Sequence, residues 1–462
     1  MTSITVSAAE LLLHRLQALD VAYIFINSGT DYPPVIEAWA KMRATGQQVP
    51  ELVICPHENA AIGMAHGYYL GSGKVQAVMV HTNVGLANAA CGVINLANSN
   101  IPVLIFGGRT PISEHSHFGC RNTPIGYGQE MRDQAALIRE SVKWDFELRI
   151  ADQIGEHVDR AWAIARSLPK GPVYLSLPRE PLCETFTIDE QALHAEPTQQ
   201  PVRYAPTRAD IASAADAIAN AMQPVIFAQR GARTSGGFAR LNTLVKEWAI
   251  PVVEYWGTEV TLGSDNPMLA GSDPEGWLSA ADVIIVIDSQ APWIIEESRC
   301  NDSCKVIQIG PDPLFSRYPV RGYRADINLA GETDEVFELL QEALQPLVAA
   351  KQRQVAEREK HVLNLIQHAK NQREALLHAN QKGAIGKPWL SYCLGQLANQ
   401  HQGKIVSELT TMPQFAGLTQ ADSYYQEALA GGLGEALPIA LGLQLARRGE
   451  LIIAAVGDGS YL

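Results

Sequence analysis

The sequence of 462 residues is poor in charged and aromatic side chains, which make up 18% and 7% of it, and has no long apolar run. Its longest apolar stretches, at 283–287 and 451–456, are far shorter than the roughly 20 residues that a membrane-spanning helix needs. The N-terminus lacks a basic patch followed by an apolar core, so no secretory signal is predicted. We therefore expect a cytoplasmic protein without a membrane anchor.

The seven cysteines are scattered, odd in number and contain no C-x-x-C pair. This pattern argues against a disulfide framework and against a structural zinc site. The 49 acidic side chains exceed the 36 basic ones and give a net charge of −13, which opposes binding to nucleic acid and to anionic lipid. What is present, 47% hydrophobic residues over a length that suits two to four domains, is typical of a globular enzyme.

Short apolar runs alternate with helix-like segments, a pattern typical of β-α units around buried parallel sheets. A first group of runs covers 22–26, 52–55, 75–80, 103–106 and 173–177, a second covers 225–228, 252–255, 283–288 and 306–309, and a third covers 405–406 and 451–456. A helix with a Ser7 and Glu10 capping box is predicted over 8–19. The sequence thus predicts an α/β fold of three doubly wound parallel-sheet domains.

Two segments between these groups are polar. Residues 189–206 contain proline without clear periodicity and predict a surface linker, whereas 351–382, rich in Lys, Arg, Glu and Gln, predict a solvated helix that connects two domains. The third group has only two strands, which cannot bury a sheet of this class. We therefore expect the last domain to be truncated at Leu462.

The clearest candidate for chemistry is the turn Gly457-Asp458-Gly459-Ser460 behind the run 451–456. At the carboxyl end of a parallel strand, glycines let the backbone approach a phosphate, and Asp458 offers a hard oxygen ligand to a magnesium ion. An ordinary Asp-Gly turn is the alternative.

Polar residues also follow the strands of the first group. Glu58 lies behind 52–55 at the start of an Ala-rich helix, where a carboxyl group among apolar neighbours can share a proton with a basic ring nitrogen of a ligand; the alternative is a helix-start Glu favoured by the dipole. His81, behind 75–80, can relay protons or be a structural histidine. Thr30 follows 22–26, so three loops present polar groups at the edge where open α/β sheets bind ligands.

Together these motifs resemble the thiamine diphosphate-dependent decarboxylases and acetohydroxyacid synthases, in particular the benzoylformate decarboxylase-like subgroup. The resemblance rests on His-Glu-Asn-Ala-Ala at 57–61 with the glycines of 67–68 and 73–75, and on 431–438 together with 457–460. It implies a pyrimidine-binding domain over 1–185, a central domain over 200–345 and the first part of a diphosphate-binding domain over 380–462.

The resemblance also implies roles for individual residues. Glu58 would hydrogen-bond the aminopyrimidine N1′ of the cofactor, His81 would act in catalysis, and Thr30 would contact the substrate carboxylate. Asp458 would bind Mg²⁺, and the second metal ligand, an Asn, would lie beyond Leu462. The cofactor would further contact Thr410, Thr411, Gly431, Leu433, Gly457, Gly459 and Ser460.

The implied activity is the decarboxylation of a 2-oxo acid with thiamine diphosphate and magnesium, through a C2 ylide and an enamine. His81 tilts the interpretation toward decarboxylases, because synthases commonly carry Ser or Thr there. The subgroup's second active-site His is not found after 283–288, where Gln290 and Trp293 stand. An acetolactate synthase-like carboligase and a non-catalytic cofactor-binding relative stay open as alternatives. The family also implies a homodimer or homotetramer; the substrate side chain and FAD binding are left open.

Overall fold

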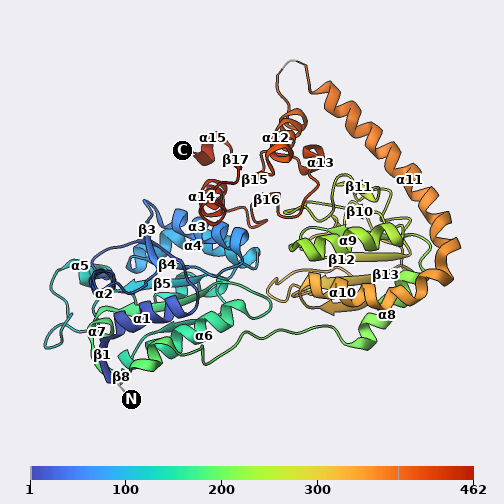
Figure 1. The fold of residues 1–462 in the computed structure, drawn as a ribbon. Coiled ribbons are helices and arrows are strands. Elements are labelled where there is room, and N and C mark those ends of the chain that lie inside the picture. The colour runs from blue at the N-terminus through green and yellow to red at the C-terminus, as the bar shows by residue number, and fades with distance from the viewer. Residues whose placement is uncertain (1–2, 383, 462) are drawn as a thin grey trace. The chain divides into compact units, whose positions relative to one another are not determined.

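The five apolar runs of the first group lie in a parallel sheet of six strands in a computed structural model, which describes residues 3–382 and 384–461 (Figure 1). The strand order is β3-β2-β4-β5-β7-β6. The elements are β2 (Tyr23–Asn27), α2 (Pro33–Ala44), β3 (Glu51–Ile54), α3 (Glu58–Ser72), β4 (Ala77–Val80), α4 (Thr82–Asn98), β5 (Leu104–Arg109), α5 (Ile125–Gly128), β6 (Asp145–Glu147), α6 (Ile154–Arg166), β7 (Val173–Pro178) and α7 (Arg179–Cys183).

Successive side chains of the central strands enter two separate cores, as expected for a sheet covered on both faces. Ile24 and Ile26 of β2 pack in one core with α1 (Ala8–Ala18) and α6, and Phe25 packs in the other with α3 and α4. The predicted capping box of α1 is confirmed. The Ser7 hydroxyl accepts from the amide of Glu10 at 3.1 Å, and the Glu10 carboxylate accepts from the amide of Ser7 at 2.8 Å.

Three strands of this region were not predicted. β1 (Ser3–Ser7) and β8 (Thr185–Asp189) form a separate antiparallel pair, and β6 lies at the edge of the main sheet. Their side chains are mostly intermediate or exposed, so they lack the uninterrupted apolar run that marks a buried strand.

The second group of runs forms another six-stranded parallel sheet, in the order β11-β10-β9-β12-β13-β14. Its elements are α8 (Arg208–Asn220), β9 (Pro224–Ala228), α9 (Ser235–Glu247), β10 (Val252–Val253), β11 (Leu269–Gly271), β12 (Val283–Ile287), β13 (Lys305–Gly310), β14 (Ile327–Ala330) and α10 (Thr333–Leu344). The short strands β11 and β14 were not predicted.

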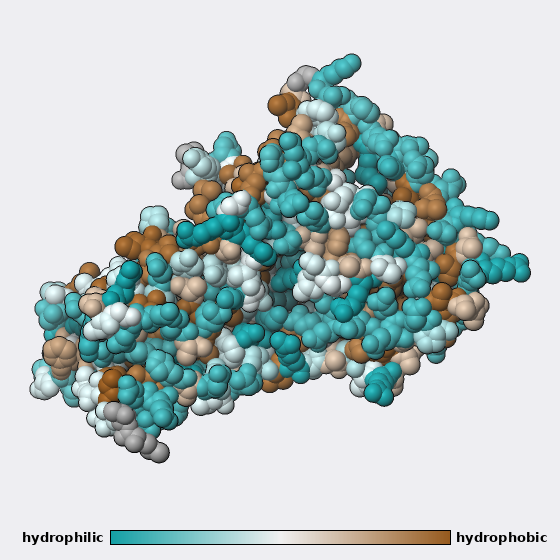
Figure 2. Space-filling view, viewed as in Figure 1, coloured by the Kyte–Doolittle hydropathy of each residue, from teal (hydrophilic) through white to brown (hydrophobic). Residues whose placement is uncertain are grey.

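The predicted solvated helix is confirmed as α11 (Val348–Ala379). Its outward side, along the upper right of the view, is mainly hydrophilic (Figure 2). Within the helix only Arg358, Val362 and Ile366 are buried, and the two apolar ones join the core of the second sheet.

The last part of the chain adds α12 (Lys387–His401), α13 (Pro413–Ala416) and a parallel sheet of order β16-β15-β17, with β15 (Lys404–Ser407), β16 (Tyr424–Gln426) and β17 (Ile452–Ala455). The helix α14 (Ala436–Ala446) precedes β17, and α15 (Asp458–Tyr461) follows it. No helix among residues 3–382 and 384–461 combines the length and apolar character needed to cross a membrane.

The chain divides into two compact units. The first comprises the described residues up to Val202, Glu427–Gly449 and those from Gly459 onward, and the second comprises Arg203–Gln426 and Glu450–Asp458. In the first unit, α14 packs closely on α3. A Cβ at Gly442 would lie 2.0 Å from the carbonyl oxygen of Met64, so only glycine permits this approach of the two helices.

Candidate active site

Glu58 is the first residue of α3 and is 7% exposed. Its Oε2 accepts a hydrogen bond from the side-chain amide of Asn88 at 3.1 Å. Its Oε1 has no hydrogen-bond partner among the residues that the structure describes. A Cβ at Gly85, in the first turn of α4, would come within 3.0 Å of this oxygen. The fold therefore shields the carboxyl group, orients it through Asn88 and leaves one oxygen for a ligand.

His81 lies between β4 and α4 with its ring held on both sides. Nδ1 is 2.7 Å from Oδ1 of Asp31, and the side-chain amide of Gln129 lies 3.0 Å from Nε2. The second oxygen of Asp31 accepts from the backbone amide of Thr82 at 3.0 Å. The ring also lies against Gly29, where a Cβ would be 2.3 Å from Nδ1. The hydrogen bond with Asp31 raises the pKa of His81, although burial acts in the opposite direction.

Thr30 is exposed in the loop after β2, next to Asp31. Its backbone carbonyl accepts from the guanidinium of Arg179 at 3.3 Å. Thr30, Asp31, Thr82 and Gln129 line one small pocket, which has an empty volume of about 290 Å³. The sequence-predicted Thr30 therefore lies at the same pocket as the two partners of His81.

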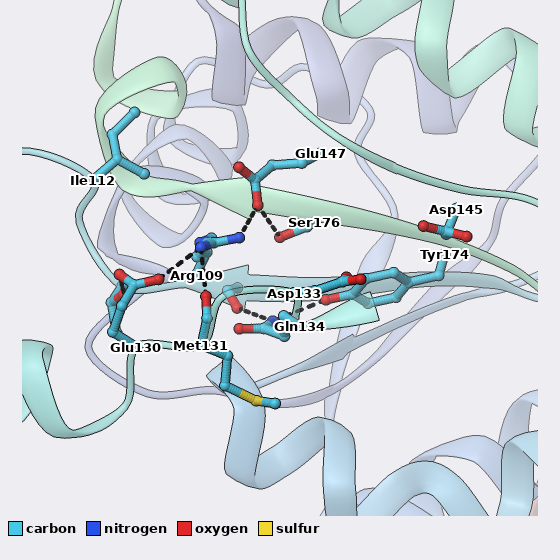
Figure 3. A network of polar contacts seen from close by, with 12 residues as sticks. Arg109, Ile112, Glu130, Met131, Asp133, Gln134, Asp145, Glu147, Tyr174 and Ser176 are labelled. Carbon is cyan, nitrogen blue, oxygen red and sulfur yellow. Dashed lines mark hydrogen bonds and ion pairs between the residues drawn. The ribbon is translucent and has the colours of Figure 1, made fainter. Parts of the chain in front are cut away.

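Gln129, whose side chain contacts His81, belongs to a segment that ion pairs hold at the carboxyl edge of the first sheet. Arg109, at the end of β5, donates to Glu130 at 2.6 Å and to the carbonyl of Met131 at 2.8 Å, and it also contacts Glu147. Figure 3 shows its guanidinium between the two carboxylates. Because Glu130 follows Gln129 directly, this network fixes the backbone beside the amide that meets His81.

A second asparagine of α4, Asn95, forms hydrogen bonds that hold residues 431–435 against this helix. The side-chain amide of Asn95 donates to the carbonyl of Gly432 at 2.8 Å, and its oxygen accepts from the amide of Gly432 at 3.2 Å. The buried carboxylate of Glu435 accepts from Asn95 and lies 3.0 Å from Nδ1 of His66. Asn88 and Asn95 are two helical turns apart on α4, so one face of this helix holds both Glu58 and the 431–435 segment.

The predicted residues Gly431 and Leu433 lie in this segment and face outward. Leu433 is 57% exposed, and a Cβ at Gly431, which has a φ of 70°, would meet no atom within 4 Å. The structure thus brings Gly431 and Leu433 into the same compact unit as Glu58, His81 and Thr30.

Thr410, Thr411, Gly457 and Asp458 belong to the second unit, whereas Gly459 and Ser460 belong to the first. The hydroxyl of Thr411 is buried and bonds to Ser407 at 2.7 Å, so in this structure it is directed into the domain. The hydroxyl of Thr410 donates to the carbonyl of Glu408 at 3.0 Å.

The turn after β17 is open to solvent. Gly457, Asp458 and Gly459 are exposed, and added Cβ atoms at the two glycines would meet nothing within 4 Å. In the described part of the chain, no three His, Cys, Asp or Glu side chains gather as a metal site. A single carboxylate beside solvent-exposed glycines fits a magnesium ion that takes its other ligands from phosphate oxygens and water.

Three partners of the site were not anticipated from the sequence. Asp31, Asn88 and Gln129 each hold a predicted catalytic residue, yet they are separated from it by 50, 30 and 48 positions. Asp31 had one signal, its place in a polar loop behind an apolar run. The position of Gln129 depends on the ion pairs of Arg109, which no local pattern reveals.

Three models of thiamine pyrophosphate enzyme domains match the chain. The N-terminal TPP binding domain matches residues 6–137, the central domain 211–340 and the C-terminal TPP binding domain 407–462. Together these matches cover more than half of the chain. The first and last of them are thiamine pyrophosphate-binding domains by description.

Curated relatives are similar at low identity. The acetolactate synthase large subunit of Haemophilus influenzae is 24% identical, over 98% of this chain and 78% of the relative. Acetolactate synthase isozyme 3 large subunit of Escherichia coli is 26% identical over the same shares. A probable 2-ketoarginine decarboxylase of Pseudomonas aeruginosa is 25% identical, over 89% of this chain and 70% of the relative.

Solved structures share the fold. A thiamine diphosphate-dependent 4-hydroxybenzoylformate decarboxylase of Rhodococcus jostii superposes with a TM-score of 0.75 at 20% identity, over 98% of this chain and 81% of that one. The benzoylformate decarboxylase of Polynucleobacter necessarius gives 0.73 at 18% identity over the same shares. The three domain models cover more than half of the chain and the parallel α/β sheets agree with them, so the chain belongs to the thiamine pyrophosphate enzyme family.

Proposed function

We propose that this enzyme decarboxylates a 2-oxo acid with thiamine diphosphate and Mg²⁺. The observation that carries the proposal is the shielded carboxyl group of Glu58, with one oxygen held by Asn88 and the other without a partner among the described residues. Such a group is suited to hydrogen-bond a ring nitrogen that must gain and lose a proton. When bound, the cofactor supplies a nucleophilic carbon and an electron sink for the departing carboxylate.

The residues at the carboxyl edge of the first sheet would handle the substrate. His81, with Nδ1 on Asp31 and Nε2 facing Gln129, would hold and transfer a proton at Nε2. Thr30, exposed at the adjoining pocket, would bind the substrate carboxylate. The shielded surroundings of Glu58 favour loss of the carboxylate, because the charge is dispersed as carbon dioxide departs.

The remaining predicted residues would hold the cofactor. Asp458 would bind Mg²⁺ among phosphate oxygens, while Gly457, Gly459 and Ser460 would let the backbone approach the diphosphate. Gly431 would accept from the pyrimidine amine and Leu433 would support the bent cofactor, a role that suits its outward-facing side chain. Thr410 and Thr411 remain predicted diphosphate contacts, and the domain ranges 1–185, 200–345 and 380–462 remain predictions as well.

A second candidate is carboligation of the acetolactate synthase type. It is favoured by the acetolactate synthases among the relatives, at 24% and 26% identity. Product analysis separates the two functions: pyruvate that yields a branched hydroxy acid indicates carboligation, and a 2-oxo acid that yields only its aldehyde and carbon dioxide indicates decarboxylation.

We also propose that the enzyme is a homodimer or homotetramer. The face of α4 that carries Val84 and Ile94 is apolar and about half exposed, at 50% and 48%, and it adjoins the helix turns that hold Glu58. An apolar face of this kind suits contact with another copy of the chain. Sedimentation of the purified protein tests this, and a monomer at micromolar concentration contradicts it.

Replacement of Glu58 by Gln tests the proposed function. Gln keeps the shape of the side chain but cannot exchange a proton with a ring nitrogen, so we expect proton exchange at C2 of bound thiamine diphosphate to slow by about 10² to 10⁴-fold. The exchange is measured by quench and NMR in the enzyme loaded with the cofactor and Mg²⁺. The matched control is Glu37→Gln at an exposed position of α2. An unchanged exchange rate in Glu58→Gln refutes the assignment of Glu58.

A further inference from the structure

A pocket lies under α11 at the amino ends of β9 and β10, in the second unit. Pro224 is the first residue of β9, and Pro251 directly precedes β10. The pocket has an empty volume of about 780 Å³. Since ligands of open α/β sheets bind at the carboxyl ends of the strands, this pocket lies at the opposite edge from the usual binding crevice of such a domain.

The pocket contains a buried cation without a partner. Arg358 is only 5% exposed, and none of its three guanidinium nitrogens has a hydrogen-bond partner among the described residues. Burial lowers the pKa of Arg358 to about 10, which still leaves the guanidinium charged at neutral pH. A charged group buried in this way costs several kcal/mol unless an anion or other acceptors pair with it.

Three of the neighbouring polar side chains are engaged elsewhere, and a fourth, His361, lines the pocket from an exposed position. Asp282 is an acidic residue whose negative charge acts on Arg358. Its carboxylate accepts hydrogen bonds from the backbone amides of Met222 and Gln223, at 2.6 and 2.9 Å. Glu357 pairs with Arg353 at 3.2 Å on the solvent side of α11. Gln354 donates to the carbonyl of Ala221 at 2.7 Å. These bonds supply no acceptor to Arg358.

The walls of the pocket determine what could pair with Arg358. They are largely apolar and include Pro224, Val225, Pro251, Trp277 and Val362. A single guanidinium binds one carboxylate through two parallel hydrogen bonds and matches its single charge. A phosphate dianion would bring a second charge into walls that offer no second arginine or lysine.

We propose that this pocket binds a small carboxylate with an apolar body, whose carboxylate pairs with Arg358 and whose body lies against Trp277 and the proline walls. The site is separate from the residues proposed for catalysis, and it lies where α11 joins the core of the second sheet through Val362 and Ile366. A ligand there would fasten the connecting helix to the central sheet and raise the stability of the second unit.

The test measures thermal unfolding of the full chain, without added cofactor, in a zwitterionic buffer. Hexanoate, hexan-1-ol and inorganic phosphate are the probes. We expect hexanoate to raise the Tm of the wild type in a saturable manner, and the other two to have no such effect. Arg358→Met should abolish the shift. The matched control, Arg353→Met, removes a guanidinium from the exposed side of the same helix and should keep the full shift.

A second measurement keeps the test decisive if Arg358→Met folds poorly. In the wild type, hexanoate should slow amide hydrogen exchange in residues 222–225 and 354–362 and leave the first unit unchanged. The proposal is overturned if hexanoate shifts Arg358→Met as much as the wild type, if hexanoate gives the wild type neither a shift nor protection, or if phosphate stabilises through Arg358 as well as hexanoate does. These readouts do not depend on decarboxylase activity.

Discussion

The two six-stranded parallel sheets of this chain have different strand orders, and they carry different side chains at the point where each order reverses. In the first sheet, the loops after β2 and β4 meet there and join Asp31 to His81, whose side chain is 18% exposed. In the second sheet, the loops after β9 and β12 join Arg230 to Asp288 at 2.7 Å, with side chains 5% and 10% exposed. Both sheets therefore place an ion pair across the same topological position.

The chemistry of the two pairs is different. An imidazole next to a carboxylate and a side-chain amide can gain or lose a proton near neutral pH, whereas a guanidinium stays charged. In the second sheet, the side chain of Gln229 also accepts from the backbone amide of Gln290 at 2.9 Å, which links the loops after β9 and β12. Both sheets thus carry polar side chains where the strand order reverses, and we propose that the side chains at the first position act in catalysis and those at the second stabilise the fold.

The largest expected effect comes from breaking the structural pair. Asp288→Asn retains the shape of the side chain, and Asn tolerates the left-handed backbone found here, with a φ of 35°. It removes the charge that faces the guanidinium of Arg230, so we expect the second unit to lose about 3 to 5 kcal/mol of stability. Urea unfolding read by hydrogen exchange of β9 and β12 measures the loss. Asp265→Asn, at an exposed position of the same unit, is the control and should change little.

A loss below about 1 kcal/mol would mean that the Arg230–Asp288 pair contributes no more than an ion pair at the protein surface. That result would contradict the structural role assigned to the pair in the second sheet. The first unit serves as an internal reference in the same experiment. Its exchange rates should not respond to Asp288→Asn.

The sequence predicted the central strands of both sheets because each is an apolar run between helical segments. The runs at 283–288 and 306–309 correspond to β12 and β13, and their ends agree to within one residue. The strands β1, β6 and β8 were missed, since edge strands alternate or expose their side chains. Glu58 and His81 were candidates because each follows an apolar run, and the family resemblance supplied their predicted roles. Their partners Asp31, Asn88 and Gln129 depend on contacts across tens of residues, which periodicity does not encode.

A smaller loss is expected from the corresponding change in the first sheet. One oxygen of Asp31 is 2.7 Å from Nδ1 of His81 and the other accepts from the amide of Thr82, so Asp31→Asn replaces one of these two oxygens by an NH2 group and removes the charge. We expect a cost of about 1 to 3 kcal/mol in the first unit. The pKa of His81 should fall as well, because the hydrogen bond that raises it involves the Asp31 carboxylate. NMR titration of the ring measures the pKa, and an unchanged value contradicts the assigned cause.

The smallest expected effect is a dependence of stability on pH. It should be seen for the His81–Asp31 pair and not for the Arg230–Asp288 pair. The pKa of His81 is raised above its ordinary value of 6.5, so the folded protein favours the imidazolium. This stabilisation is complete below the unfolded pKa and is lost as the pH rises through the raised folded pKa. His81→Gln should therefore cost more stability at pH 5.5 than at pH 9, measured as the difference from wild type in urea unfolding. The Arg230–Asp288 contact contains no histidine, so the cost of Asp288→Asn should be the same at both pH values. If the cost of His81→Gln were constant or greater at pH 9, the imidazole would be held neutral by Gln129, and its partnership with Asp31 would serve to orient the ring.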